Sequence, residues 1–384
     1  MIACVKQLFD PSHTIVTLMN LAKATRRYEK WLAGHTRLLK DDLALKHQRM
    51  AEGPFPFLRA TFYRWMQLWP DLCSQLKRGT VVLSVGDLHL ENFGTWRDID
   101  GRLVWGVNDF DEAYPLPYTA DLARLAASAL LAIHDQHLKV TGADACDAIL
   151  EGYAASLDAG GKPFVLEEQD TWLRDIATGE LRNPVRFWKK MEGLKRVKDV
   201  PASAREALES LLPEPGIGYE TAHRVAGLGS LGRLRFVALA EWRGGRVARE
   251  AKALVPSVCF WTGLGKETEI LYQAIITSAV RCPDPFVQLR GNWIVRRLAP
   301  HCSRIEMSAL PARRDEYRLL RAMGWETANI HLGTRARIKD LKADLKKRKG
   351  KWLREAARCM AGAVHQDWQD WRKELGLEKE EKEP

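Results

Sequence analysis

The chain is organised around one stretch, Val81-Val-Leu-Ser-Val-Gly-Asp-Leu-His-Leu-Glu-Asn-Phe-Gly94, which Val107-Asn-Asp-Phe-Asp-Glu-Ala113 follows closely. The first segment opens with an apolar run that predicts a buried strand, and its polar second half predicts a short loop. In the second segment, a short strand would place Asp109 and Asp111 on one face, because strand side chains alternate with a period of two. Between the segments, Asp100-Gly101 predicts a hairpin turn, which needs residues that tolerate positive φ. The polar residues of the first loop are Asp87, His89, Glu91 and Asn92.

The hairpin should bring these two acidic loops to the same edge. So many carboxylates would repel one another unless positive charge lay between them. A divalent metal ion bound together with a phosphate group is the simplest source of that charge. The sequence therefore predicts a metal and phosphate site at this edge.

Composition and charge are those of a soluble globular protein with anionic partners. At 384 residues the chain can bury a large core, and we expect two lobes or domains. The net charge of +10 and the pI near 9.2 favour nucleotides, acidic surfaces or nucleic acid as partners. Much of the excess lies between Arg335 and Lys351, where a solvated helix face is the simpler interpretation.

The cysteines and the apolar runs indicate the compartment. The seven cysteines are scattered, odd in number and never spaced Cys-x-x-Cys, which argues against a zinc ribbon and against a disulfide scaffold. Reduced thiols in a cytosolic protein fit best. No apolar run is long enough to span a bilayer, and residues 1–10 lack the pattern of a signal peptide. We expect a cytoplasmic protein with no membrane partner, whose residues 376–384 form a disordered tail.

Helical and strand-like periodicities alternate along the chain, which predicts an α+β fold. A Pro-aromatic loop begins at Gly53, and Arg59 near its end either forms a structural ion pair or points at the acidic loops. Thr119 can cap a helix whose first turn contains Asp121. Helical patterns cover residues 14–50, 60–76, 119–136, 143–160, 165–210, 266–280 and 310–373, and strand-like runs cover residues 286–289 and 292–298.

A glycine-rich segment lies far downstream of the acidic loops. Residues 225–254 alternate like a β-meander, with Gly244-Gly245 as a hairpin turn, and contain the pattern Gly-x-Gly-x-x-Gly at Gly227, Gly229 and Gly232. A dinucleotide-binding loop should open a helix, whereas the residues that follow this pattern alternate as a strand does. A glycine loop between two strands, with a lysine on the next strand, is the arrangement of kinases. A plain tight hairpin is the alternative.

The same motifs carry a resemblance to known families. Asp87-Leu-His-Leu-Glu-Asn92 has the Asp-x-x-x-x-Asn spacing of a kinase catalytic loop, and Asn108-Asp109-Phe110 looks like an element of aminoglycoside phosphotransferases. More closely, the chain resembles the largely bacterial family called domain of unknown function 2252, which is grouped with protein-kinase-like folds. That resemblance spans most of the chain between Pro54 and Leu332. Its motifs are Val85-Gly-Asp-Leu-His-Leu-Glu-Asn-Phe-Gly94, Asn108-Asp-Phe-Asp-Glu-Ala113, Asp121-Leu-Ala-Arg-Leu-Ala126 and Gly227-Leu-Gly-Ser-Leu-Gly232.

The resemblance implies a two-lobed, protein-kinase-like fold that is circularly permuted. Kinases place the glycine loop and the lysine before the catalytic loop, whereas here Asp87 precedes Gly227. Such permutations are tolerated when termini lie close together at the surface. Val85 replaces the histidine of protein kinases, and the segment between the two acidic loops is longer than usual. The implied division is a helical catalytic lobe over residues 1–215 with its metal-binding hairpin at 81–113, a small antiparallel β-sheet lobe for the nucleotide over 216–300, and C-terminal helices over 301–375 that pack on the catalytic lobe.

The resemblance also implies roles in an ATP- and Mg²⁺-dependent transfer of a phosphoryl group to an unidentified small-molecule or protein hydroxyl. Asp87 would be the catalytic base or would orient the acceptor hydroxyl, and Asp121 would brace its loop from the following helix. Asn92 and Asp109 would hold Mg²⁺, with Asp111 as a second candidate ligand. Phosphoryl transfer needs a carboxylate at the acceptor and cations at the phosphates, which agrees with these assignments.

On the nucleotide side, the resemblance assigns Lys252 to the α- and β-phosphates of ATP. Glu269 or Glu267, from the helix predicted over 266–280, would fix Lys252 through an ion pair. The glycine loop would cover the phosphates with Gly227, Gly229, Ser230 and Gly232.

Other functions fit parts of the pattern. One is a pseudokinase that binds a nucleotide or a partner, and another is an enzyme that transfers AMP. Gly-Asp-x-His is also similar to metallophosphoesterases, but their sites need several further histidines, so His89 is interpreted mainly as a residue that fixes its loop. Nucleic-acid binding by the basic helices is the weakest hypothesis. The sequence leaves the acceptor and the oligomeric state open.

Overall fold

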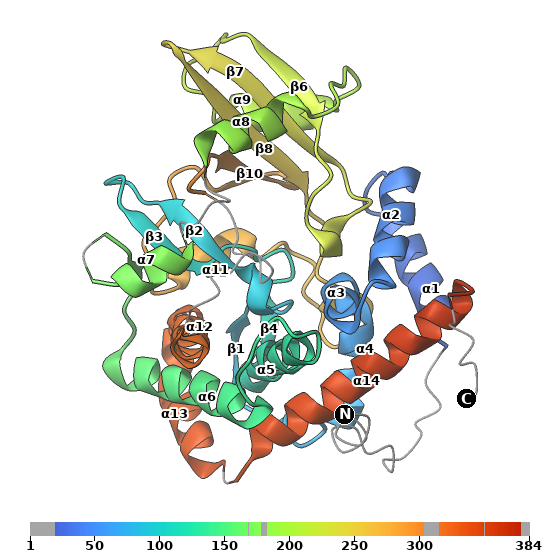
Figure 1. Ribbon diagram of the computed structural model, residues 1–384, viewed down its shortest axis with the longest axis vertical. Helices are drawn as coiled ribbons and strands as arrows, with labels where there is room; N and C mark the ends of the chain where they lie inside the picture. The colour runs from blue at the N-terminus through green and yellow to red at the C-terminus, as the bar shows by residue number, and fades with distance from the viewer. Residues whose placement is uncertain (1–19, 168, 178–182, 303–314, 349, 378–384) are drawn as a thin grey trace.

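The computed structural model describes residues 20–167, 169–177, 183–302, 315–348 and 350–377, and these form a mixed α+β fold as predicted. Within those ranges there are fourteen α-helices and three antiparallel sheets. Figure 1 shows the largest sheet at the top of the view and most of the helices below it. The sequence-based expectations for the N-terminal residues, for Cys4 and for most of the tail concern residues outside the described ranges.

The largest sheet has five strands in the order β6-β7-β8-β10-β9, all antiparallel. The predicted β7–β8 hairpin is present, but its turn lies at Arg243 and Gly244, one residue earlier than predicted, where φ values of 46° and 78° suit a type I′ turn. Helices α8 and α9 lie over this sheet in Figure 1. The bounds are β6 (Tyr219–His223), β7 (Arg235–Trp242), β8 (Gly245–Ala253), β9 (Gln288–Arg290), β10 (Trp293–Leu298), α8 (Pro184–Glu192) and α9 (Ala202–Glu209).

Two smaller sheets hold the acidic loops. The predicted strand before the first loop is β1, but it pairs with β4 rather than with the hairpin, while the turn at Asp100-Gly101 joins β2 to β3. Asp109 and Asp111 were predicted to lie on a strand, which is wrong: residues 108–113 form the loop between β3 and β4. The bounds are β1 (Val81–Ser84), β2 (Phe93–Arg97), β3 (Leu103–Val107), β4 (Tyr114–Pro117) and β5 (Phe164–Val165), and β5 pairs with β3.

The helical part is built around α5 (Tyr118–His134), which is buried along almost its whole length. The long helix α14 (Trp352–Glu374) packs across α5, and α6 (Gly142–Ala159) packs against α12 (Glu316–His331). Close backbone contact joins the last pair, because a Cβ atom on Gly152 of α6 would lie 1.8 Å from the carbonyl oxygen of Arg321 on α12. This core supports the acidic loops from below.

Some helix boundaries differ from the sequence-based expectation. The pattern over residues 14–50 contains two helices in the described part, because the first ends at Gly34 and a turn precedes the second. The Pro-aromatic segment is a helix rather than a loop, since proline at the first helical position loses no needed hydrogen bond. Thr119 does not cap α5, because its hydroxyl donates to the Leu76 carbonyl at 2.9 Å. The remaining helices are α1 (Leu21–Ala33), α2 (Lys40–Met50), α3 (Pro54–Ala60), α4 (Phe62–Leu72), α7 (Thr171–Ala177), α10 (Val258–Trp261), α11 (Tyr272–Ser278) and α13 (Ile338–Lys347).

No helix among the described residues is long and apolar enough to cross a bilayer. The six cysteines that the structure describes are free thiols, and burial raises the pKa of Cys146 and Cys73 to about 12.

A buried carboxyl group supports the strand that precedes the second acidic loop. Glu326 of α12 accepts a hydrogen bond from the Val107 amide at 3.2 Å and another from Asn329 Nδ2 at 2.8 Å. Burial raises the pKa of this carboxyl to about 7 from its ordinary value of 4.5, although Arg281 opposes the shift. Between those values the folded protein keeps a proton that the unfolded chain has released, so the folded state loses stability as pH rises.

We therefore expect the free energy of unfolding to fall by up to ~3 kcal/mol between about pH 4.5 and pH 7 because of Glu326. Glu326→Gln should remove this part of the pH dependence, since the amide does not titrate. Urea unfolding at several pH values measures the effect. Glu206→Gln, at an exposed position, is the control and should keep the wild-type slope; equal slopes in all three proteins would contradict the prediction.

Candidate active site

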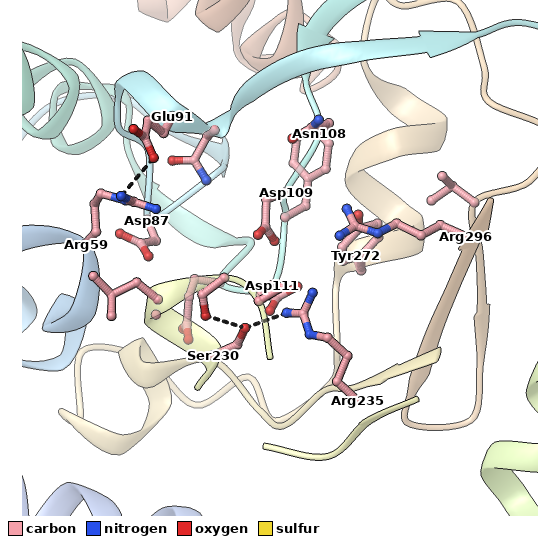
Figure 2. A pocket seen from close by; sticks show the side chains of 18 of the residues that line it. Arg59, Asp87, Glu91, Asn108, Asp109, Asp111, Ser230, Arg235, Tyr272 and Arg296 are labelled. Atoms are coloured by element: carbon pink, nitrogen blue, oxygen red, sulfur yellow. Dashed lines mark hydrogen bonds and ion pairs between the residues drawn. The ribbon is translucent and has the colours of Figure 1, made fainter. Parts of the chain in front are cut away.

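A cavity of about 1070 Å³ lies between the five-stranded sheet and the helical part. Residues from both acidic loops, from the glycine-rich turn and from α11 line it, and Figure 2 shows their side chains from close by. Cavities of this size are typical of small-molecule and cofactor sites. The predicted site residues that line it are Asp87, Asn92, Asp109, Asp111, Gly227, Gly229 and Ser230.

The first acidic loop is held by Asp121 of α5, which is completely buried. Its carboxylate accepts hydrogen bonds from the Val85 amide at 2.7 Å and the Gly86 amide at 2.9 Å. On its other side it contacts His331 Nε2 at 3.0 Å, and His331 is held in turn by Tyr153 at 2.8 Å. Asp121 therefore fixes the backbone that leads into Asp87, in the position that the sequence predicted for it.

Gly86 allows the backbone of the first acidic loop to lie very close to the backbone of the second. Its φ is +82°, and a Cβ atom would lie 2.3 Å from the Glu112 carbonyl oxygen. Gly86→Ala should lower the free energy of unfolding by about 2–4 kcal/mol, because the left-handed backbone and a contact with rigid backbone both disfavour alanine. Urea denaturation measures the loss. Gly101→Ala is the matched control: its φ is +77° but a Cβ there meets nothing within 4 Å, so its loss should stay near 1 kcal/mol; equal losses would contradict the prediction.

Asp87 is positioned for acid–base chemistry. One carboxylate oxygen, Oδ1, accepts a hydrogen bond from Arg124 Nε at 2.8 Å and another from Arg124 Nη2, which also donates to the Leu58 carbonyl at 2.9 Å. The side chain is 21% exposed and lines the cavity. Burial raises the pKa of Asp87, and the Arg124 guanidinium opposes that shift. A proton acceptor with a raised pKa, held at one oxygen, can take a proton from a substrate hydroxyl.

The rest of the first loop is a single 3₁₀ turn over Leu90–Asn92. The Asn92 side-chain oxygen accepts a hydrogen bond from the His89 amide at 2.8 Å, and His89 Nδ1 accepts one from the Glu91 amide at 3.2 Å. His89 thus fixes its loop, as the sequence favoured. The Asn92 oxygen keeps a second lone pair, so it can still accept a metal ion. Arg59 of α3 forms an ion pair at 2.8 Å with Glu91 of the first acidic loop.

The second acidic loop contacts Lys252 of β8, whose side chain is buried and is not among the residues that line the cavity. Lys252 Nζ lies 3.3 Å from Asp109 Oδ1 and 2.5 Å from Asp111 Oδ2. Burial acts to raise the pKa of Asp109, but the Lys252 ammonium holds it below its ordinary value, whereas burial and the charge of Asp109 raise the pKa of Asp111 to about 7. Asp111 Oδ1 is buried and receives no hydrogen bond from the residues that the structure describes. The pair therefore has an unused oxygen facing a neighbouring carboxylate, which suits a cation.

The described residues contain no group of three or more His, Cys, Asp or Glu side chains arranged to hold a metal ion. Mg²⁺ does not need such a cage, because it is commonly bound by one or two carboxylates, water and substrate phosphates. The Asp109–Asp111 pair fits that mode. The loop of Asn92 lies beside it, since the Asn108 amide donates to the Asn92 carbonyl at 2.9 Å.

Three residues that were predicted to serve the nucleotide site, Glu267, Glu269 and Gly232, lie away from the cavity. Glu267 and Glu269 are exposed in the segment before α11, which begins only at Tyr272, and neither contacts Lys252. The predicted ion pair is therefore wrong: Lys252 contacts Asp109 and Asp111 instead. Gly232 lies outside the cavity, where a Cβ atom would meet the Leu43 side chain at 2.5 Å.

The glycine-rich turn connects β6 to β7 and folds as a 3₁₀ turn over Leu228–Ser230. It lies against the end of α3 and the first acidic loop, because a Cβ atom on Gly229 would be 2.9 Å from the Arg59 carbonyl oxygen and 3.6 Å from Asp87 Oδ2. Lys46 of α2 donates to the Gly229 carbonyl at 3.1 Å and ties the turn to the helical part. The turn therefore covers Asp87 as well as the cavity.

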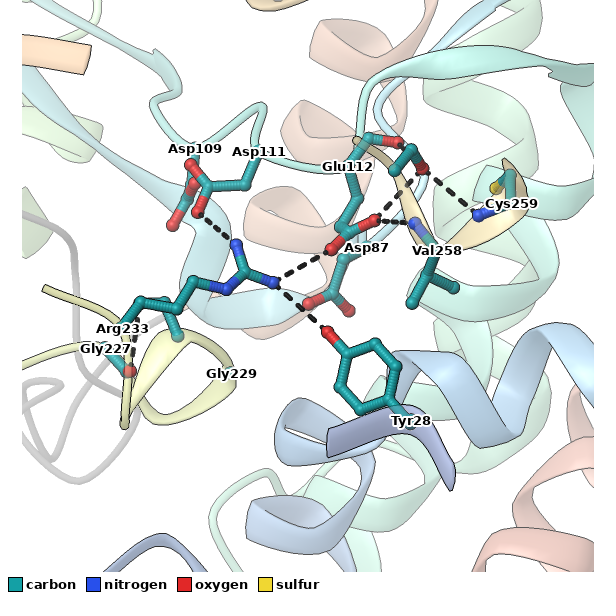
Figure 3. A network of polar contacts seen from close by, with 12 residues as sticks. Tyr28, Asp87, Asp109, Asp111, Glu112, Gly227, Gly229, Arg233, Val258 and Cys259 are labelled. Atoms are coloured by element: carbon teal, nitrogen blue, oxygen red, sulfur yellow. Dashed lines mark hydrogen bonds and ion pairs between the residues drawn. The ribbon is translucent and has the colours of Figure 1, made fainter. Parts of the chain in front are cut away.

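Sequence reasoning missed a buried network beside Asp87, which Figure 3 shows. Arg233 Nη2 lies 3.2 Å from the Tyr28 hydroxyl and 3.4 Å from Glu112, and its Nη1 lies 3.8 Å from Asp111. Glu112 also accepts a hydrogen bond from the Val258 amide at 2.8 Å. This network links the second acidic loop to α1 and α10.

A signal for the missed residues exists in the sequence. Arg124 is one helical turn from Asp121, so both face the first loop. Arg233 and Arg235 alternate with apolar residues before and along β7, which placed them on one face of a strand, and both line the cavity.

The comparisons with known proteins agree with part of this description. A family model described as "Uncharacterized protein conserved in bacteria (DUF2252)" matches residues 37–211, the part of the chain that contains both acidic loops and α5. No curated protein and no solved structure matches the chain.

Proposed function

We propose that the protein is an ATP- and Mg²⁺-dependent phosphotransferase of the kinase-like type, acting on a hydroxyl group of a small molecule or a protein. The direct contact of Lys252 with Asp109 and Asp111, two carboxylates that line a large cavity, carries this proposal. A lysine beside a pair of metal-binding carboxylates, with a further carboxylate nearby, is the set of groups that phosphoryl transfer requires.

The order of the elements supports a permuted kinase-like fold. Lys252 lies on the central strand of the five-stranded antiparallel sheet, and the catalytic-type loop at Asp87 comes from the helical part. In kinases the sheet precedes that loop, whereas here it follows. We propose that the two parts correspond to the two lobes in reversed sequence order.

Each side chain then has a defined task. Asp87, oriented by Arg124, accepts the proton of the acceptor hydroxyl at its cavity-facing oxygen. Lys252 donates to phosphate oxygens once the carboxylates no longer hold it. Asp109, Asp111 and Asn92 would hold Mg²⁺, which supplies charge neutralisation between the phosphates.

Labelled ATP separates this proposal from its alternatives. Incubation of the protein with Mg²⁺ and ATP labelled at the γ-phosphate should release the label as inorganic phosphate or transfer it to an acceptor, because phosphoryl transfer moves that phosphate alone, whereas AMP transfer would release it within pyrophosphate. Transfer of an α-label to protein or another acceptor would instead establish AMP transfer. Hydrolysis of a generic phosphate ester without ATP would favour a phosphoesterase, and binding of ATP without turnover would favour a pseudokinase.

A further inference from the structure

A buried cluster of arginines lines the cavity above the acidic loops. Glu250 of β8 is completely buried and lies two residues before Lys252, so both side chains project from the same face of the sheet. Three guanidinium groups surround its carboxylate: Arg296 Nε at 2.8 Å, Arg235 Nη1 at 3.2 Å and Arg224 Nη1. We call Arg224, Arg235 and Arg296 the arginine cluster.

The sheet register explains why the arginines meet at this point. Arg296 on β10 is directly opposite Glu250, and Arg235 on β7 is directly opposite Lys252. Directly opposed residues of antiparallel strands share a face and lie within side-chain reach. Arg224 follows β6 and bonds through its amide to the Arg235 carbonyl at 3.2 Å. Three neighbouring strands, β7, β8 and β10, and the residue that follows β6 therefore contribute to one charged surface.

The arginine cluster carries more positive charge than its own surroundings compensate. Glu250 supplies one negative charge for three guanidinium groups, and these three groups hold the pKa of Glu250 well below its ordinary value although burial opposes this. All three arginines line the cavity. Guanidinium groups in a partly dehydrated site match phosphate oxygens in charge and in geometry. The three guanidinium groups exceed the two carboxylates, Glu250 and Asp109, that act on them, and this excess of positive charge at a cavity wall favours an anion.

The position of the cluster identifies which side of the reaction it serves. In Figure 2, Asp87 and Arg59 lie on one side of Asp109, whereas Arg235 and Arg296 lie away from them, toward the sheet. An acceptor has to approach Asp87. An anion bound at the arginine cluster would therefore lie on the opposite side of the Asp109–Asp111 pair from the acceptor. Glu250 and Lys252 are separated by about 7 Å along the strand, as two residues of a strand are, which suits a short chain of phosphates that reaches from one to the other.

The glycine-rich turn holds one member of the arginine cluster in position. Arg235 Nη2 donates to Ser230 Oγ at 2.7 Å, and a Cβ atom on Gly227 would lie 3.0 Å from that same Nη2. The absence of a side chain at Gly227 therefore lets the guanidinium lie flat against the turn. At the other end of the turn, Gly229 lies against the Arg59 carbonyl and the Asp87 carboxylate.

We propose that the arginine cluster, organised by Glu250, is a binding subsite for a chain of phosphates, and that it holds the leaving-group phosphates of the nucleotide. The glycine-rich turn has this role in kinases; here it positions Arg235 and covers Asp87. The assignment to a nucleotide rests on the proposed function. The chemistry that the cluster recognises, two or more linked phosphates, is independent of it and is shared by inorganic polyphosphates.

The experiment measures binding of inorganic tripolyphosphate without metal, and of ATP with Mg²⁺, by calorimetric titration of the full chain. Wild type should bind both. Arg296→Gln and Arg224→Gln, at the two more exposed members of the cluster, should each weaken both affinities roughly tenfold to a hundredfold, since each removes a charged hydrogen-bond donor. Arg246→Gln on β8, the strand of Glu250, replaces an exposed arginine paired with Glu192; it is the matched control and should bind as wild type does.

The outcomes separate the subsite from the proposed function. ATP binding that is the same in wild type, Arg296→Gln and Arg224→Gln would overturn the subsite and leave the phosphotransferase standing. A second outcome is that wild type binds ATP no more tightly than tripolyphosphate and that both variants lose tripolyphosphate binding. This outcome would support the phosphate subsite and contradict its assignment to a nucleotide. Melting curves show whether each variant is folded, and Arg296→Lys, which keeps the charge, should recover part of the affinity if the subsite is real.

Discussion

Replacing Asp87 with asparagine should reduce Mg²⁺-dependent ATP turnover by about 10²–10⁴-fold, because the variant cannot accept a proton at the oxygen that faces the cavity. Asparagine has the same shape, and its side-chain oxygen can keep the hydrogen bond from Arg124 Nε. The loop is held by Asp121 through backbone amides, so its conformation does not depend on the Asp87 charge. Nucleotide affinity should therefore change by no more than a small factor.

Release of labelled phosphate measures the turnover, with water as the acceptor, and the ATP-induced rise in melting temperature measures binding. Asp100→Asn, at the exposed tip of the β2–β3 hairpin, is the control and should turn over ATP at the wild-type rate. Turnover by Asp87→Asn at the wild-type rate would show that this carboxylate has no part in the chemistry.

Replacing Lys252 with methionine should have two separate effects. The folded protein should lose up to about 3 kcal/mol of stability, because methionine leaves the partly buried carboxylates of Asp109 and Asp111 next to each other without their cation. The stabilisation that ATP and Mg²⁺ give to wild type should largely disappear, since the lysine would be the partner of the phosphates. Mg²⁺ alone should stabilise Lys252→Met more than wild type, because the metal ion can occupy the position of the missing ammonium.

Thermal melts with and without MgCl₂ and ATP distinguish these effects, each compared with the same variant without ligand. Lys266→Met, at an exposed position outside the cavity, should behave as wild type. If Lys252→Met melts at the wild-type temperature and still gains the full ATP-dependent shift, Lys252 is not a phosphate ligand.

The local chemistry of the site was largely predictable from the sequence. A buried strand ending before Asp87 and an acidic segment at Asp109 define where carboxylates gather, since they follow from hydrophobic periodicity and turn residues. The lysine was predictable because the meander after Gly232 alternates with a strand period, which places Lys252 on one defined face. The role of Asp121 in bracing its loop was implied by the family resemblance, because its place in the first turn of a helix indicates only a favourable interaction with the helix dipole.

The parts that failed depend on contacts between segments distant in sequence. The partner of Lys252 was expected on a following helix, but residues 266–271 are not helical and Glu269 remains in solvent. Instead, Lys252 contacts the loop that contains Asp109, which is more than a hundred residues away in the sequence. The arginine cluster was missed for the same reason. Alternation places Arg235 and Arg296 each on one face of its own strand. Only the register of the sheet shows that these faces are on the same side and that Glu250 lies between the two arginines.

The most direct measurement of the central claim is a calorimetric titration of the wild-type protein with ATP, with Mg²⁺ present and then with Mg²⁺ removed by a chelator. A nucleotide site formed by Lys252, Asp109 and Asp111 predicts saturable binding at millimolar ATP or below, and a clear weakening when the metal is removed. No binding at several-millimolar ATP in the presence of Mg²⁺ would contradict the claim.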